Sequence, residues 1–266
     1  MTDTPDLHAS SLRHFVDRLK IAEMIPDPYP HYCLDRVFPE AYYQLLLRHL
    51  PSASIYQNLF EITTLKLDHF RFRHERDLAD GWTASLPDEL RRFWEEFNAW
   101  FLGPELARAV LDSFAGPMRE RFGESSAWPA VSVEAQLIRH QAGYFLGPHT
   151  DLSTKLVVLL IYLPPDDSRP HLGTSLYRPK KSGFTCPDSN HYPFDEFVNA
   201  KTAPYRRNSL LAFERSDRSF HGVEPLAEGD LATCNRDLIQ YVLYDRSARQ
   251  AQLEARHLAA MQGVAQ

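Results

Sequence analysis

Residues 136–151 read QLIRHQAGYFLGPHTD and are followed by the apolar run KLVVLLIYL at residues 155–163. The first stretch begins with alternating apolar and polar residues, and the second consists largely of leucine and β-branched residues, so both indicate buried strands. Residues i and i+2 of an extended segment point the same way, which places His149 and Asp151 on one side of a strand end. We therefore expect a sheet rim that carries two potential metal ligands.

The remaining elements predict an α+β fold with a mainly β core. Short strands are expected at 174–177, 209–213 and 237–244, separated by turn residues, and helices at 39–50, 89–102 and 104–114. The aromatic stripe of 89–102 has helical spacing and indicates core packing, with a dimer face as the alternative. Helices followed by short strands favour a sandwich or jelly roll with helices packed on one sheet.

Three parts of the chain are expected. Residues 1–130 form a helical N-terminal portion packed on the core, 131–246 form the β core, and 247–266 form a C-terminal surface helix or tail. The stretch 181–208 is long and has no clear periodicity, which is typical of a functional lid or mobile loop. A simple insertion is the alternative.

The composition indicates a soluble globular protein. The 266 residues carry a net charge of -6 and no basic stripe, so we expect no nucleic-acid partner. The three cysteines (Cys33, Cys186 and Cys234) form no C-x-x-C motif, which favours a reducing compartment. Neither a signal peptide nor a long apolar run is visible, so we expect a cytoplasmic protein without a membrane partner. The oligomeric state is not indicated.

His221 follows the predicted strand 209–213 and completes a possible metal site. Two histidines and one carboxylate are the ligand set of a mononuclear non-haem iron(II) centre, which leaves three coordination positions open. A hydrogen bond between His149 and the nearby carboxylate, and a buried structural role for His221, remain open as alternatives. His140 and His191 are close enough in sequence to compete as ligands.

Arg236 begins the predicted strand 237–244, next to the strand end that carries His221. A guanidinium binds a carboxylate in a bidentate fork, so Arg236 suits the far carboxylate of a 2-oxo acid bound at the metal. An ion pair at the rim with Asp237 or Glu228 is the alternative.

Several segments taken together resemble the 2-oxoglutarate- and Fe(II)-dependent dioxygenases, in particular their prolyl 4-hydroxylase-like branch. They are residues 136–151, 155–163, NSLLAF (208–213), SFHGV (219–223) and RDLIQY (236–241). The resemblance implies a double-stranded β-helix, iron held by His149, Asp151 and His221, and 2-oxoglutarate anchored by Arg236. The chain departs from the family where GTSL (173–176) replaces a GGEL-like strand, and where residues 226–235 lengthen the interval before Arg236.

The resemblance also implies an activity. Oxygen and 2-oxoglutarate would be consumed, with release of succinate and carbon dioxide, while an unactivated C–H bond of a small-molecule or peptidyl substrate is hydroxylated; ascorbate is a candidate reductant. The carboxylate of Asp151 favours hydroxylation, because halogenating relatives carry a small residue there. Residues expected to bind substrate are Tyr144, Arg178, Arg215 and Arg218.

Two other functions remain open. One is a non-catalytic, cupin-like protein that binds a metal or another ligand. The other is a zinc-dependent hydrolase, although zinc would require a general base and no H-E-x-x-H motif is present.

Overall fold

The computed structural model describes residues 4–63, 65–187, 189–231 and 234–261. Its strands form two antiparallel sheets, one of seven strands in the order β1-β9-β6-β11-β4-β3-β2 and one of four in the order β5-β10-β7-β8. The strands are β1 (His31–Asp35), β2 (Gln57–Asn58), β3 (Arg73–Asp77), β4 (Val131–His140), β5 (Leu146–His149), β6 (Lys155–Tyr162), β7 (Thr174–Pro179), β8 (Phe197–Ala203), β9 (Ser209–Glu214), β10 (His221–Val223) and β11 (Arg236–Asp245).

Alternation along the strands of the large sheet divides its side chains between two cores. In β6, Leu159 and Ile161 belong to a cluster shared with the helices, whereas Leu160 and Tyr162 belong to a cluster shared with the small sheet. Successive side chains of a strand point to opposite faces, so the large sheet forms the middle layer of the molecule. The mixed helix and sheet architecture expected from the sequence is confirmed.

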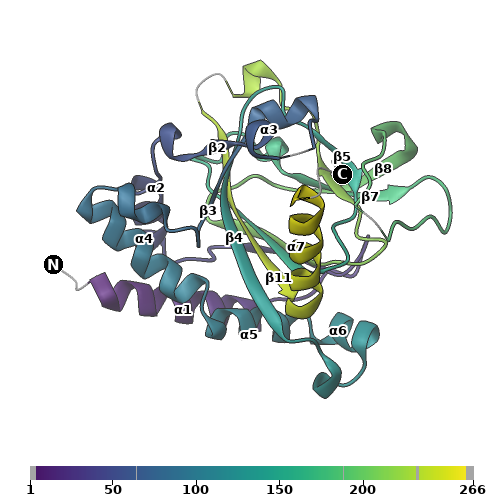
Figure 1. Ribbon diagram of the computed structural model, residues 1–266, viewed down its shortest axis with the longest axis horizontal. Coiled ribbons are helices and arrows are strands. Elements are labelled where there is room, and N and C mark those ends of the chain that lie inside the picture. The colour runs from purple at the N-terminus through teal and green to yellow at the C-terminus, as the bar shows by residue number, and fades with distance from the viewer. Residues whose placement is uncertain (1–3, 64, 188, 232–233, 262–266) are drawn as a thin grey trace.

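Helices cover the outer face of the large sheet, where α1, α2, α4 and α5 gather on one side of the strands (Figure 1). The helices are α1 (Thr4–Lys20), α2 (Glu40–Arg48), α3 (Leu59–Ile62), α4 (Asp88–Phe101), α5 (Pro104–Ser113), α6 (Ala115–Phe122) and α7 (Arg246–Met261). The aromatic stripe of α4 is buried within the chain, and Phe101 packs edge-on against Tyr241 of β11 with ring centroids 5.2 Å apart. The stripe is therefore core, as its periodicity indicates.

Residues 1–130, predicted to be helical, also contain the strands β1, β2 and β3, which all join the large sheet. A boundary at residue 130 therefore does not separate the helices from the sheet. The strand β3 reads RHERD, which lacks the apolar alternation by which strands are recognised. The interval 181–208 also contains a strand, because β8 pairs with β7, and only 181–187 and 189–196 are described without a strand before it.

The C-terminal helix begins at Arg246 and lies in front of β4 and β11 in Figure 1. Residues 262–266 of the predicted tail lie outside the described residues. Within the described ranges, no helix has the length and apolar character needed to cross a membrane.

The carboxyl of Glu214, at the end of β9, provides a test of this packing. Burial raises its pKa to about 7, against the attraction of Arg121. This pKa is higher than that of the same carboxyl in the unfolded chain, so folding is accompanied by uptake of a proton between about pH 4.5 and 7. The free energy of unfolding therefore falls as the pH rises through that range. Glu214→Gln cannot ionise, and at pH 8 we expect it to exceed the wild type in unfolding free energy by on the order of 2 kcal/mol.

Urea denaturation of both proteins at pH 5 and pH 8 measures this difference. The advantage of Glu214→Gln should be small at pH 5 and large at pH 8. An advantage that does not change with pH would contradict the raised pKa.

Candidate metal centre and its cavity

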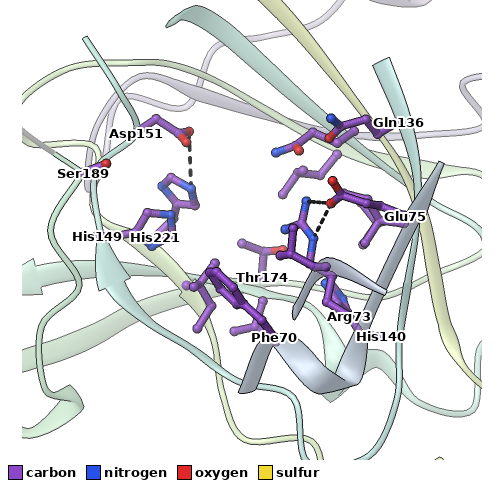
Figure 2. A pocket seen from close by; sticks show the side chains of 18 of the residues that line it. Phe70, Arg73, Glu75, Gln136, His140, His149, Asp151, Thr174, Ser189 and His221 are labelled. Carbon is purple, nitrogen blue, oxygen red and sulfur yellow. Dashed lines mark hydrogen bonds and ion pairs between the residues drawn. The ribbon is translucent and has the colours of Figure 1, made fainter. Parts of the chain in front are cut away.

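Two histidines face each other across neighbouring strands of the small sheet. His149 ends β5, His221 begins β10, and the two residues are direct antiparallel partners. Asp151 follows two residues after His149, with its Oδ2 atom 3.5 Å from Nε2 of His221. One ligand atom from each residue lies within 4.8 Å of the others, and all three residues are buried (Figure 2). The structure thus brings the three predicted ligands together.

Backbone carbonyl groups orient both imidazole rings. Nδ1 of His149 lies 3.0 Å from the carbonyl oxygen of Gly147, and Nδ1 of His221 lies 3.0 Å from that of Ser219. A carbonyl oxygen only accepts hydrogen bonds, so each Nδ1 carries the proton and each Nε2 offers a lone pair to a metal. Burial lowers the pKa of both histidines, which keeps the rings neutral.

Lys155 forms an ion pair with Asp151, the third candidate ligand. Its Nζ atom lies 2.5 Å from Oδ1 of Asp151, and both side chains are largely buried. Burial alone would raise the pKa of the Asp151 carboxyl, but the adjacent ammonium outweighs it, so this pKa lies below its usual range. Oδ2 has no hydrogen-bond partner in the part of the chain that the structure describes. One oxygen is therefore held by Lys155 while the other is available to a cation.

Close backbone contacts require glycine beside both histidines. A Cβ atom on Gly222 would lie 2.4 Å from the carbonyl oxygen of Leu146, and one on Gly147 would lie 2.5 Å from that of Tyr192. The lack of a side chain at Gly222 therefore permits the close approach of β10 to β5, and its lack at Gly147 permits the approach of the segment around Tyr192 to β5.

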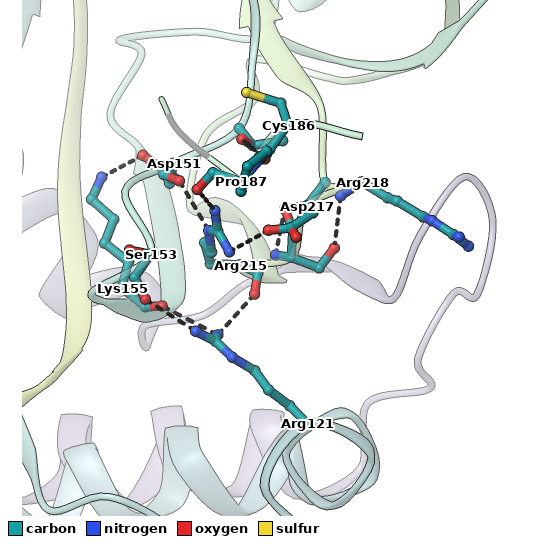
Figure 3. A network of polar contacts seen from close by, with 12 residues as sticks. Arg121, Asp151, Ser153, Lys155, Cys186, Pro187, Arg215, Asp217 and Arg218 are labelled. Atoms are coloured by element: carbon teal, nitrogen blue, oxygen red, sulfur yellow. Dashed lines mark hydrogen bonds and ion pairs between the residues drawn. The ribbon is translucent and has the colours of Figure 1, made fainter. Parts of the chain in front are cut away.

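Two arginines brace the segment from Asp151 to Lys155 from behind (Figure 3). Arg215 donates from Nε to the backbone oxygen of Asp151 at 2.9 Å, and it also binds the Asp217 carboxylate at 2.7 Å and the Pro187 carbonyl. The guanidinium of Arg121, on α6, donates to backbone oxygens in the same region. Its acceptors are Ser153, Lys155 and Arg215. This network fixes the chain at the metal ligand.

The three candidate ligands line a cavity of about 350 Å³. Arg236, at the start of β11, is one of the residues that line it and is only 1% exposed. Its guanidinium donates to the Leu172 carbonyl, to Nδ1 of His140 at 2.8 Å and to Oγ1 of Thr174 at 3.1 Å. All three acceptors are neutral, and none of the ion pairs in the described part of the chain includes Arg236. A buried cation without an anionic partner suits an anionic ligand.

The alternative ion pair of Arg236 with Asp237 or Glu228 is not formed. Asp237 instead pairs with Arg139, its neighbour across β4 and β11, through a bond of 2.8 Å from Nε. Adjacent residues of a strand point to opposite faces, which explains why Arg236 lies in the cavity and Asp237 does not.

The structure places the four residues expected to bind substrate at different sites. Tyr144 lines the cavity and stacks on His140, with ring centroids 3.8 Å apart. Arg178 is exposed and pairs with Asp27, and Arg218 is also exposed; neither lines the cavity. Arg215 lies behind Asp151, where its donors are used by the bracing contacts. Of the four, only Tyr144 is brought together with the metal site.

Neither His140 nor His191 joins the group of possible ligands found among the described residues, although both line the cavity. Nδ1 of His140 accepts a hydrogen bond from Arg236, and the ring of His140 stacks on Tyr144. The ring of His191 lies edge-on to His149, with centroids 4.9 Å apart.

Comparison with solved structures relates the fold to known proteins. The chain is similar to a prolyl hydroxylase from Trichoplax adhaerens, determined with a peptide fragment of the hypoxia inducible factor oxygen degradation domain, at 12% identity and a TM-score of 0.50. The match covers 94% of this chain and 97% of that one. The two proteins share a fold. The resemblance expected from the sequence is thus confirmed at the level of the fold.

Other matches are more distant in structure. A Pseudomonas putida prolyl-4-hydroxylase is 14% identical, covering 88% of this chain and 99% of its own, with a TM-score of 0.43. An oxidoreductase of the 2OG-Fe(II) oxygenase family from Burkholderia pseudomallei is 12% identical, covering 88% and 90%, with a TM-score of 0.44. No family model and no curated protein matches the sequence.

Lys155 is the functional residue that sequence reasoning missed at the metal site, and its only signal is a charge at the start of an apolar strand. Lys155→Met removes the group that holds Oδ1 of Asp151, so we expect the affinity for Co(II) to fall about 10- to 100-fold. Titration of the protein with Co(II), followed by its visible absorption, measures the change.

The matched control is Lys180→Met, at an exposed position outside the cavity. It should bind Co(II) like the wild type. Equal affinities in the two variants would show that Lys155 does not support the ligand.

Proposed function

We propose that this protein is a 2-oxoglutarate- and Fe(II)-dependent dioxygenase that hydroxylates an unactivated C–H bond, on a core that forms a double-stranded β-helix. The observation that carries the proposal is the pairing of two features in one cavity. The first is a group of three possible ligands from two histidines and a carboxylate, and the second is the buried guanidinium of Arg236, which forms no ion pair among the described residues.

The donor set fits iron(II). His149, Asp151 and His221 would hold the ion through two Nε2 atoms and one carboxylate oxygen, and such a set leaves three coordination positions open. The neutral imidazoles and the ionised carboxylate are the protonation states that bind a divalent cation without first losing a proton.

The surroundings of Arg236 fit a dicarboxylate. Nε2 of His140 is buried and has no partner among the described residues, and it is an N–H donor because Nδ1 of that ring accepts from Arg236. Thr174 accepts from both Arg236 and the hydroxyl of Tyr162, at 3.1 and 2.9 Å. Arg236 and His140 would therefore receive the far carboxylate of 2-oxoglutarate.

When bound, Fe(II) supplies the activation of oxygen that couples decarboxylation of 2-oxoglutarate to hydroxylation of the substrate. One oxygen atom of O₂ enters the new hydroxyl group and the other enters succinate, with carbon dioxide released. The chain contributes the placement of both reactants. Apolar side chains such as Leu160, Val223 and Leu238 line the same cavity and limit the access of water.

The cofactor pair has a direct test. Anaerobic titration with Fe(II) in the presence of 2-oxoglutarate should produce a weak visible charge-transfer band that neither component gives alone. The band should be absent in His221→Ala, whose thermal unfolding would confirm that it is folded. Failure of the wild type to form the band, or its persistence in His221→Ala, would contradict the proposal.

Arg236 has a separate role and a separate prediction. Arg236→Met removes the guanidinium but keeps an unbranched buried side chain, so we expect the dissociation constant for 2-oxoglutarate to rise by roughly 10- to 100-fold while Co(II) affinity without 2-oxoglutarate changes little. Titration of 2-oxoglutarate into the metal-loaded protein measures it. Arg178→Met is the matched control, and the same loss in that variant would exclude Arg236 as the anchor.

A further inference from the structure

The face of the large sheet that looks into the cavity carries several polar side chains on three neighbouring strands, interspersed with apolar ones such as Ile138 and Leu238. Elsewhere the same face is apolar, as at Leu160 of β6 and Phe213 of β9. On β3, β4 and β11 the polar side chains that line the cavity are Arg73, Glu75, Gln136, His140, Arg236 and Gln240. Polar groups between two sheets weaken a hydrophobic core, so their concentration here indicates a polar ligand.

His140 and Arg236 belong to the proposed cosubstrate site, which leaves four groups without an assigned use. Two of these are the glutamines, which are direct cross-strand partners on β4 and β11. Both are half-buried, and no hydrogen bond to either side-chain amide is formed within the described residues. Each amide offers both donors and an acceptor to a ligand.

The other two groups form a pair of opposite charges. Nε and NH2 of Arg73 both lie 2.9 Å from a single oxygen of Glu75, Oε2, and the two side chains are 16% and 14% exposed. Figure 2 shows this pair and Gln136 on the side of the cavity opposite the metal ligands. The cavity wall therefore presents a cation, an anion and amides at neighbouring positions, facing the metal site.

The space available favours a small molecule. The cavity of about 350 Å³ must also hold 2-oxoglutarate. Its lining includes Leu59 and Phe70 from the segment before β3, His191 from the loop before β8, and Arg249 and Arg256 from α7. Once 2-oxoglutarate is bound, the remaining volume suits a molecule of amino-acid size.

We propose that the substrate is a small zwitterion of the free amino acid class, bound between the metal site and the Arg73–Glu75 pair. Its carboxylate binds Arg73, its ammonium group binds Glu75, and the amides of Gln136 and Gln240 bind its remaining polar groups. The inference rests on the proposed function, since the zwitterion is the molecule that is hydroxylated.

A ligand series tests the proposal without any substitution. The protein is loaded anaerobically with Fe(II) and 2-oxoglutarate, and each of the common L-amino acids is added, followed by the N-acetyl and carboxamide derivatives of those that bind. At least one free amino acid should shift the charge-transfer band and, with oxygen, accelerate succinate formation and gain one oxygen atom. Blocking either end should weaken binding at least tenfold.

The possible results distinguish the proposed amino-acid substrate from the proposed dioxygenase activity. A normal band that no free amino acid perturbs, or that blocked derivatives and short peptides perturb equally well, overturns the zwitterion and leaves the dioxygenase intact. Absence of the band itself overturns the proposed function, and the inference with it.

Variants then locate the contacts. Glu75→Gln removes the anion that receives the ammonium, so the dissociation constant for the amino acid should rise at least tenfold while that for 2-oxoglutarate changes less than threefold. Arg178→Met, outside the cavity, is the control for surface charge. Unchanged amino acid binding in a folded Glu75→Gln protein would overturn the assignment, and Gln240→Leu provides a second test that leaves the ion pair in place.

Discussion

The antiparallel pairing of His149 with His221 is the constraint on which the site depends. It sets the two imidazoles side by side at the rim of the small sheet, with ring centroids 4.3 Å apart. Asp151 can join them only because the chain leaves β5 directly afterwards. Gly222 allows the close contact with β5 that this pairing needs, and Lys155 and Arg215 hold Asp151 by its side chain and its backbone.

The cavity arises from the way the two sheets are joined. They share an apolar core over β6 and β9, whereas over β4 and β11 polar side chains stand among the apolar ones, and β3 adds Arg73 and Glu75. Such substitutions cost packing energy, which the helices on the outer face offset with a large aromatic cluster. The stability of the fold and the polarity of the cavity are thus supplied by opposite faces of the same sheet.

Strong periodicity made much of this molecule predictable. The buried strand β6 and the aromatic helix α4 follow from local patterns, whereas the candidate ligands His149 and His221 are predicted from the order of several motifs along the chain. The strand β3 escaped detection because its inward residues, Arg73 and Glu75, face a cavity instead of a core. The positions of Arg178, Arg215 and Arg218 could not be predicted, since the direction of each guanidinium depends on tertiary contacts that local sequence does not encode.

The strand β3 contributes to the cavity from a part of the chain far from the candidate metal ligands. The candidate ligands His149 and His221 lie in the small sheet, with Asp151 just after β5, whereas Arg73 and Glu75 lie on β3, which pairs with β4 and precedes His149 by more than 70 residues. Substitutions in β3 therefore change the wall of the cavity without altering any of the candidate metal ligands. The shape and charge of this wall can thus be varied by substitution in a strand of five residues, separately from the three side chains of the candidate metal centre.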